Sequence, residues 1–518
     1  MTDVNPIIAA LEPKSVWSIF AGIATQPRPS KHEQKIRAHT RQFAESHGLK
    51  VREDRTGNMV IEAPASPGLE NAPTIVLQGH FDMVPEKDPE TPHDFLTDPI
   101  TLKLETTAEG RQYVCADKTT LGADNGIGMA MALAAAIDPD VKHGKLELLN
   151  TVDEEAGMTG AKALKSDFFK GKIFVNLDSE DDKAIYIGCA GGSDTTLTWK
   201  LKLKPCTGAC EPTRVAVSGL RGGHSGGDIH ENRGNANKVL ARVLHGAIEG
   251  LRLVEIQGGS KRNVIPRQAD AIVCGPKGIR RALKKSAAEI QRKVVEESNE
   301  PGVKITIEPA TVATKKSASA EETRRVIEAL VAVPHGVHGM HPKMPNLVQT
   351  SNNIGVVTST LSNSKAKKVK GKSKAKDAAP LDPAKADTLT VEVHALSRSS
   401  SKSLLHATRD QIEAVGRLAG AEAVSGNEYP GWEPNPDSPA LAVCKRVYRE
   451  LFSDEPHVAA IHAGLECGII NERMGNTLDT VSFGPSITGA HSPDERVYVD
   501  SVAKSWKFLQ AVLAELAK

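Results

Sequence analysis

Buried strands that end in acidic residues or histidine are the feature that most constrains the fold of this chain. The segment Thr74–Lys87 reads TIVLQGHFDMVPEK, and its apolar part predicts a buried strand that ends at His80 and Asp82. Side chains two residues apart on a strand point to the same side. His80 and Asp82 could therefore face one site together, or they could mark where the strand meets water.

Three further segments have the same character. In TTLGADNGIGMAMALAAAI, Asp124 precedes a long apolar helix, and capping of the helix start is the alternative role for its side chain. A strand in GKLELLNTVDEEAGMTGAKAL ends at Asp153, Glu154 and Glu155, and a strand in GKIFVNLDSEDD ends at Asp178. The alternation of strands and helices predicts an α/β fold with a parallel sheet. Because ligands bind beyond the carboxyl ends of such strands, we expect these carboxylates to gather at one edge.

So many carboxylates require a cation at that edge. Like charges within a few ångströms raise each other's pKa, and a pair of divalent metal ions removes the conflict. Oxygen and imidazole ligands without thiolate suit zinc, and also manganese or cobalt. His491 lies in the loop segment SFGPSITGAHSPDERV. A lone loop histidine is usually a surface residue, but beside a carboxylate cluster that is missing an imidazole we expect it to be a ligand.

Length and composition limit the class of protein. A chain of 518 residues predicts two or three domains, and 39% hydrophobic with 25% charged residues is typical of a soluble globular protein. No stretch approaches the roughly eighteen apolar residues of a membrane span, and the N-terminus does not resemble a signal peptide. Seven cysteines occur without a CxxC pair, and we interpret the nearness of Cys206 and Cys210 as coincidence. Together these features predict a reducing, cytoplasmic location.

One segment departs from this composition. KAKKVKGKSKAK (Lys365–Lys376) contains seven lysines in a chain whose net charge is only +1. The segment is poor in apolar residues, which predicts a disordered loop over about 361–388. Contact with nucleic acid or an acidic partner is the alternative role for this tract. The tract has no aromatic residues and no folded basic surface beside it, so we do not expect a nucleic-acid partner.

The ordered motifs of this chain resemble those of the M20 family of metallopeptidases. The motifs are GHFDMVPEK, LGADNGIGMAMALAAA, DEEAGMTGA, NLDSED and GAHSPDERV, together with GGHSGGDIHENRGNANK, PGWEPNPDSP and HAGLECGII. Within that family the chain is most similar to the cytosolic aminoacyl-histidine (Xaa-His) dipeptidases. The resemblance spans nearly the whole chain, and only the lysine-rich segment falls outside it.

The resemblance implies a role for each residue of the cluster. Asp124 would bridge two divalent metal ions, most simply zinc, with manganese or cobalt as alternatives. The other ligands would be His80 and Asp178 for one ion, and Glu155 and His491 for the second. Asp82 would hydrogen-bond His80 and fix its tautomer. Glu154 would be the general base that activates a metal-bridging water for attack on the peptide carbonyl.

The middle of the chain leaves the strand-and-helix alternation of the rest. We predict a catalytic domain formed by 1–191 and 430–518, and an inserted α+β domain over 192–429, which the resemblance identifies as a lid. We predict that the lid contains two similar halves, each with helices and strands in the same order, although their residues do not match. Because one chain would hold two lid-like units, we expect that a homodimer, if it forms, is not required for catalysis.

By resemblance, three lid residues contact the substrate. His224 would polarise the carbonyl, Arg398 would bind the C-terminal carboxylate, and Asn263 would add a hydrogen bond. A surface salt bridge is the alternative for Arg398. Glu466, in HAGLECG, would receive the free amino group, although a glutamate at a helix start needs no such role.

The predicted function is hydrolysis of dipeptides, including Xaa-His dipeptides, with small peptides as substrates and no membrane partner. The alternative within the family is an M20 deacylase or a broader di- or tripeptidase. Two alternatives outside it are a non-catalytic peptide-binding relative, and an assembly or nucleic-acid role of the lysine tract.

Overall fold

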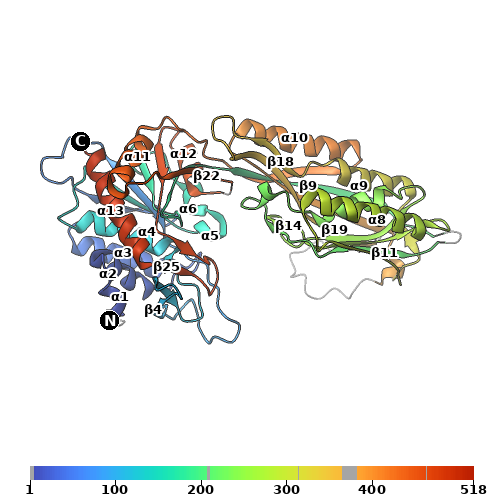
Figure 1. The fold of residues 1–518 in the computed structure, drawn as a ribbon, viewed down its shortest axis with the longest axis horizontal. Coiled ribbons are helices and arrows are strands. Elements are labelled where there is room, and N and C mark those ends of the chain that lie inside the picture. The colour runs from blue at the N-terminus through green and yellow to red at the C-terminus, as the bar shows by residue number, and fades with distance from the viewer. Residues whose placement is uncertain (1–4, 207–209, 313, 364–381, 463) are drawn as a thin grey trace. The chain divides into compact units, whose positions relative to one another are not determined.

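The computed structural model of the chain divides into two compact units (Figure 1). It describes residues 5–206, 210–312, 314–363, 382–462 and 464–518. Unit 1 comprises Met1–Cys189, Trp432–Ala460 and Leu465–Lys518, and unit 2 comprises Ala190–Gly431 with Ile461–Gly464. Within the described ranges, no helix is both long and apolar enough to cross a membrane. The prediction for Lys365–Lys376 concerns residues outside these ranges.

An eight-stranded sheet forms the centre of unit 1. Its four central strands are mutually parallel, as predicted, and the strands next to them on either side pair antiparallel, so the sheet as a whole is mixed. The antiparallel pairing of β1 with β2 has a local cause, since a short turn joins these two strands and only an antiparallel pair can accommodate it. In spatial order the strands are β1 (Lys50–Glu53), β2 (Met59–Ala63), β6 (Leu146–Thr151), β3 (Ile75–His80), β7 (Ile173–Asn176), β23 (Asp479–Ser482), β8 (Ala184–Cys189) and β22 (His457–Ile461).

The burial of these elements follows from their sequences. All six residues of β3 and all six of β6 are buried, as expected for central strands of a parallel sheet. Helix α4 (Ala123–Ile137) is rich in alanine, glycine and methionine, and it packs against both strands. Because its side chains are small, the helix can approach the sheet closely.

The remaining elements of unit 1 complete its layers. A four-stranded antiparallel sheet contains β4 (Leu102–Thr106), β5 (Gln112–Ala116), β24 (Ile487–Thr488) and β25 (Arg496–Tyr498). The other helices are α1 (Pro6–Ala9), α2 (Lys14–Ala24), α3 (Gln34–Ser46), α5 (Glu154–Gly157), α6 (Thr159–Ala163), α11 (Pro439–Phe452), α12 (Glu466–Arg473) and α13 (Val499–Leu516).

Unit 2 is built on one nine-stranded sheet. In spatial order the strands are β16 (Lys304–Pro309), β11 (Thr213–Ser218), β15 (Ala269–Cys274), β13 (Arg252–Gly258), β19 (Val348–Ser362), β20 (Thr388–Ser399), β9 (Gly191–Lys202) and β21 (Glu422–Tyr429), and β18 (Gly336–Met340) pairs with β19. Four helices contact this sheet, namely α7 (Ala236–His245), α8 (Ile279–Ser298), α9 (Ala320–Ala332) and α10 (Lys402–Leu418) (Figure 1). Two short pairs lie beside it, β10 (Lys204–Pro205) with β17 (Lys316–Ser317), and β12 (Gly223–His224) with β14 (Val264–Ile265).

The strand order confirms the predicted repeat in unit 2. Counted along the chain, the first half contributes β11, β13, β15 and β16, and the second contributes β9, β19, β20 and β21. From the edge of the sheet inward, the first half runs β16, β11, β15, β13, and the second half runs β21, β9, β20, β19. In both halves this is the fourth, first, third and second strand along the chain. The halves meet where β13 pairs with β19. The first strand of the second half precedes the whole first half in sequence, so one half is inserted within the other.

The cysteines differ from the expectation. Cys210 and Cys274 form a disulfide, and the Cys206 thiol lies beside them. Our interpretation of Cys206 and Cys210 as a coincidental pair is therefore wrong. Spacing along the sequence could not predict this group, because its third member, Cys274, is 64 residues from Cys210 and reaches it only through strand pairing.

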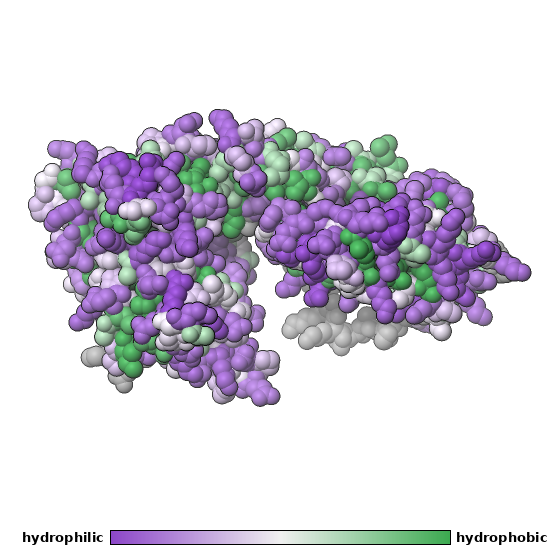
Figure 2. Space-filling view, in the orientation of Figure 1, coloured by the Kyte–Doolittle hydropathy of each residue, from purple (hydrophilic) through white to green (hydrophobic). Residues whose placement is uncertain are grey.

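On the face that Figure 2 shows, hydrophilic residues cover most of both units and hydrophobic residues form small, scattered patches. The large hydrophobic side chains exposed among the described residues are correspondingly dispersed along the sequence, from Ile7 to Val424.

Candidate active site

The carboxyl end of β3 brings His80 next to the start of α4. A Cβ atom at Gly79 would collide with the side-chain oxygen of Asn125, so only glycine lets the helix start come this close. His80 Nε2 consequently lies 3.1 Å from Asp124 Oδ1. The strand end thus presents a histidine directly to the carboxylate at the beginning of the neighbouring helix.

Two clusters share Asp124. In the first, His80 Nε2 lies 3.1 Å from Asp124 Oδ1 and 3.2 Å from Asp178 Oδ1. In the second, His491 Nε2 lies 3.1 Å from Asp124 Oδ2 and 3.0 Å from Glu155 Oε2. The potential ligand atoms of each cluster lie within 4.8 Å of one another. Each oxygen of one carboxylate therefore faces a different histidine.

Asp82 organises the residues around His80. Its Oδ1 lies 3.4 Å from His80 Nδ1, and the Ser30 hydroxyl donates to its Oδ2 at 2.7 Å. The backbone N–H groups of Glu154 and Glu155 donate to the two Asp82 oxygens at 2.9 and 3.1 Å. One buried carboxylate thus lies beside the His80 ring and accepts from the backbone from which both glutamates project.

Glu154 and Glu155 begin the short helix α5, and their carboxylates lie close together beside His80. Glu155 reaches His491, whereas the ligand atoms of Glu154, Glu155 and His80 form a third group within 4.8 Å. The Glu154 carboxylate forms no hydrogen bond among the described residues. Burial raises the pKa of Glu154 well above its usual value, and the charges of Asp178, Glu466 and Glu155 add to this effect. A carboxylate in this environment is suited to holding and releasing a proton.

The electrostatics of the two clusters favour cations. Burial opposes a charge on His80, but the carboxylates of Asp178, Asp124 and Asp82 raise its pKa well above the usual value. Hydrogen bonds to Asp124 and Glu155 raise the pKa of His491 to about 11. Burial raises the pKa of Asp178 to about 7. Several acidic groups thus share one buried site and raise both the histidine pKa values and one another's.

The composition of these clusters fits divalent metal ions. Both clusters offer only imidazole nitrogen and carboxylate oxygen, a set that zinc, manganese and cobalt accept. The buried Glu155 Oε1 also has no hydrogen-bond partner among the described residues, which leaves one of its oxygens available to an ion.

Glu495 is a site residue that the sequence analysis missed. It is 2% exposed, and its two oxygens accept hydrogen bonds from the backbone N–H groups of Leu121 and Gly122 at 2.8 and 3.0 Å and of Ala123 and Asp124 at 2.8 and 3.2 Å. The alternative role for Asp124, capping of the helix, is therefore filled by Glu495. Because His491 lies four residues before Glu495, this contact ties the His491 loop to the Asp124 segment.

Arg28 supports the same region from the N-terminal segment. Its buried guanidinium donates to the backbone oxygens of Phe81 and Asp82 at 2.9 and 2.7 Å, and also to that of Gly122. Burial lowers the pKa of Arg28, and the nearby carboxylates of Glu495 and Asp82 oppose this. No periodicity or spacing in the sequence signals either Arg28 or Glu495.

Glu466 is fully buried at the start of α12 in unit 1. Gln78 Nε2 donates to its Oε2 at 2.9 Å, and the Thr151 hydroxyl donates to the same oxygen. Its Oε1 has no partner among the described residues. Burial raises the pKa of Glu466 to about 8. One carboxylate oxygen is thus held in place while the other is left without a donor.

The predicted lid residues lie in unit 2. The His224 ring accepts hydrogen bonds at Nδ1 from the N–H groups of Gly226 and Gly227, at 3.3 and 3.0 Å. Because backbone N–H groups only donate, the proton of neutral His224 must be on Nε2. Partial burial and the charge of Arg398 lower the pKa of His224, which favours this neutral form.

Arg398 is 5% exposed and donates to the Tyr429 hydroxyl at 2.9 Å. No carboxylate forms an ion pair with it among the described residues, and its buried Nε has no acceptor there, so the surface salt bridge considered as its alternative role is absent. Asn263 is exposed, and its backbone oxygen accepts from Ser225 at 2.9 Å. A buried arginine without an acidic partner is a suitable receptor for an anionic group.

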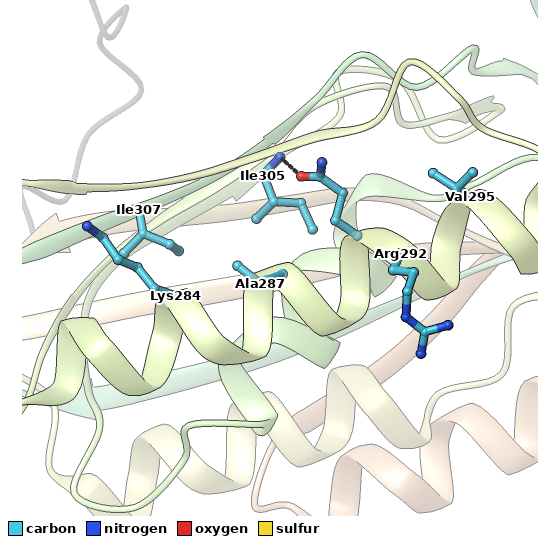
Figure 3. A pocket seen from close by; sticks show the side chains of 8 residues that line it. Lys284, Ala287, Arg292, Val295, Ile305 and Ile307 are labelled. Atoms are coloured by element: carbon cyan, nitrogen blue, oxygen red, sulfur yellow. Dashed lines mark hydrogen bonds between the residues drawn. The ribbon is translucent and has the colours of Figure 1, made fainter.

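A separate pocket in unit 2 lies between α8 and β16 (Figure 3). Apolar and basic side chains line it, including Val295, Ile305, Lys284 and Arg292, and Gln291 accepts from the Ile305 N–H at 2.9 Å. None of the predicted site residues line this pocket.

Comparisons with known proteins agree with this architecture. The model of peptidase family M20/M25/M40 matches residues 76–515. The cytosol non-specific dipeptidase of Escherichia coli (strain K12) is 39% identical over 512 residues, which cover 98% of this chain and 99% of that protein. The crystal structure of aminoacylhistidine dipeptidase from Vibrio alginolyticus superposes with a TM-score of 0.84 at 38% identity and covers 99% of both chains. Aminopeptidase PepT from Bacillus cereus shares the fold, with a TM-score of 0.59 at 17% identity over 98% of this chain and 100% of that one. This chain therefore belongs to peptidase family M20/M25/M40.

Proposed function

We propose that the chain is a metal-dependent dipeptidase that uses two divalent ions, zinc or else manganese or cobalt. His80 and Asp178 would hold one ion, Glu155 and His491 the other, and Asp124 would be shared. The shared carboxylate carries the proposal, because its two oxygens each lie 3.1 Å from a different histidine. Two ions held there would acidify a water and polarise the substrate carbonyl.

Glu154 is the proposed general base. It takes the proton of the attacking water and returns it to the leaving amine. Its support is a carboxylate without a hydrogen-bond partner beside His80 and Glu155, with a pKa raised by burial. Asp82 serves as a positioning residue, and its support is that Asp82 Oδ1 lies 3.4 Å from Nδ1 of His80, the ring nitrogen that faces away from the two clusters.

Four residues would select a small peptide. The Nε2–H of His224 donates to the substrate carbonyl oxygen, Arg398 binds the C-terminal carboxylate, and Asn263 adds a hydrogen bond. Glu466 Oε1 accepts from the substrate's ammonium group, which would supply the donors that this buried oxygen lacks.

The choice of substrate can be tested directly with the purified protein. Two relatives that match this chain at 38–39% identity carry different names, one non-specific and one aminoacylhistidine. We propose cleavage of unblocked dipeptides, including those with a C-terminal histidine, as a soluble cytoplasmic enzyme. The purified protein would be loaded with zinc, manganese or cobalt and offered Xaa-His dipeptides, other dipeptides, tripeptides and N-acyl amino acids. Faster cleavage of N-acyl amino acids would identify a deacylase instead, and efficient cutting inside long, end-blocked peptides would exclude a dipeptidase.

We also propose that a single chain suffices for catalysis. The support is the repeat in unit 2, whose first half carries His224 and whose second half carries Arg398. The alternative is that the extra half only enlarges a dimer interface. Inactive His224→Ala chains and inactive Glu154→Gln chains would be mixed under conditions that allow subunit exchange. Activity that reappears in the mixture would mean that His224 acts on a neighbouring subunit.

A further inference from the structure

Strand pairing in unit 2 gathers three cysteines from separate segments. Cys206 directly follows β10, which pairs with β17, and its N–H donates to the Lys315 oxygen at 2.9 Å. Cys210 lies just before β11, and Cys274 ends β15, the neighbour of β11 in the sheet. The backbone thus holds the three thiol positions together from two independent strand pairs.

The distances among the three sulfurs match a metal site. Their Sγ atoms lie within 4.8 Å of one another, and Cys206 Sγ is 3.7 Å from Cys274 Sγ. Two thiolates that bind a tetrahedral zinc ion at about 2.3 Å lie about 3.8 Å apart. The spacing of Cys206 and Cys210, with three residues between them, also falls in the range of paired zinc ligands.

We propose that Cys206, Cys210 and Cys274, when reduced, form a three-thiolate site for a thiophilic divalent ion such as Zn²⁺. Cys206 and Cys210 are half-buried and Cys274 is buried, so the site is open to solvent on one side. The fourth coordination position would be taken by water or by the Ser317 hydroxyl, whose oxygen lies 3.4 Å from Cys206 Sγ.

The disulfide and the metal exclude each other. Reduction by a dithiol transfers two electrons and two protons to the Cys210–Cys274 bond, leaving two thiols here and one disulfide on the reductant. Metal binding then releases the thiol protons as the thiolates form. Disulfides of cytosolic proteins are mostly transient, which is consistent with a site that alternates between two states.

Ligand chemistry separates this site from the two carboxylate clusters. Those clusters contain no sulfur, and the other cysteines among the described residues, such as Cys115 in β5, are buried elsewhere. Thiolate ligands therefore give an optical signal that belongs to the three-cysteine site alone. Co²⁺ is the probe, because bound thiolates produce an intense charge-transfer absorption and imidazole or carboxylate ligands do not.

The test uses the full-length protein, reduced with a water-soluble phosphine that is then removed without air, and titrated with Co²⁺. We expect the thiolate absorption to saturate with one ion at this site, beyond the ions taken by the two carboxylate clusters, and Zn²⁺ to abolish it. Cys206→Ser should weaken binding at least about tenfold, as for loss of a metal contact, and Cys115→Ala should not. Protein that retains the disulfide should give no signal.

Two results would overturn the proposal: no thiolate absorption in the reduced wild-type protein, or unchanged absorption in Cys206→Ser. Circular dichroism would establish that the variant is folded. If Cys206→Ser fails to fold, Cys274→Ser provides the same comparison, because it removes a different ligand of the same site. Peptidase activity is not the readout, so failure here leaves the proposed dipeptidase function untouched.

Discussion

Replacement of Glu495 by glutamine tests how the loop of His491 is held to the segment of Asp124. Each oxygen of Glu495 accepts two backbone N–H groups, at 2.8–3.2 Å. Glutamine keeps the shape but turns one oxygen into an NH₂ group, so two buried N–H groups lose their acceptor and face another donor. At about 1–3 kcal/mol for each buried unsatisfied donor, the cost is about 2–6 kcal/mol.

This free-energy cost falls on the segment that carries Asp124, so we expect the affinity of the site for metal to decrease. If it is expressed fully there, affinity falls by about 30-fold to about 10⁴-fold, since about 1.4 kcal/mol corresponds to a factor of ten. Competition with a chromophoric chelator measures the affinity, and thermal unfolding of the metal-free protein shows what part of the cost appears as stability.

Asp494→Asn is the matched control. It removes the same kind of charge one residue away, where the side chain is exposed. We expect its affinity and its unfolding temperature to equal those of the wild type. If Glu495→Gln also behaved like the wild type in both measurements, the four hydrogen bonds would contribute nothing to the site and the argument would fail.

Three further outcomes are expected. Glu154→Gln should lower turnover by about 10²–10⁴-fold with both metals retained. Asp124→Ala should lose metal, and Glu109→Gln, an exposed control, should change neither activity nor metal content. Activity assays and metal analysis of the same samples measure both. Deleting Lys365–Lys376 should leave folding and dipeptide hydrolysis nearly unchanged. The strands β19 and β20 on either side pair as far as Ser362 and Thr388, and a doubling of loop length costs only about 0.6 kcal/mol. A large loss of activity would instead assign the tract to the site. Burial lowers the pKa of His462 from 6.5 to about 3, so the unfolded chain takes up this proton at higher pH than the folded one. Acidification from about pH 7 to about pH 5 should therefore cost about 2 kcal/mol of unfolding free energy through this residue, and His462→Gln should show a correspondingly smaller loss in chemical denaturation.

The central strands and the residues that follow them could be predicted from the sequence because their signal is local. An apolar run ending in polar residues is visible at β3, β6 and β7, and parallel pairing necessarily places their ends together. β1 has no buried residue, and its pairing with β2 follows from a turn that periodicity does not reveal.

The residues that were missed act through long-range contacts. Glu495 sits in a polar loop and looks like a surface glutamate, yet it is 2% exposed because it accepts from a segment more than 370 residues earlier. Cys274 joined the cysteine group only through the pairing of β11 with β15. In both cases the deciding partner is distant in sequence, where spacing carries no information.

The repeat in unit 2 shows an intermediate case. The order of helices and strands in each half was visible, but β9, the first strand of the second half, lies before the first half begins. A comparison of the two halves as continuous segments of sequence therefore leaves one strand of each half without its counterpart. This weakens the repeat signal without removing it.

The distance along the chain between Asp124 and His491 has a consequence during translation. These residues are 367 positions apart, and Glu495 emerges later still. A nascent chain can bring together His80, Asp124 and Asp178 early, but the cluster with His491 has to wait until nearly all of the protein has left the ribosome. Contacts between such distant positions also form slowly, because a long loop must close first. A peptide-cleaving centre of this design is therefore assembled only on a chain whose synthesis is almost finished.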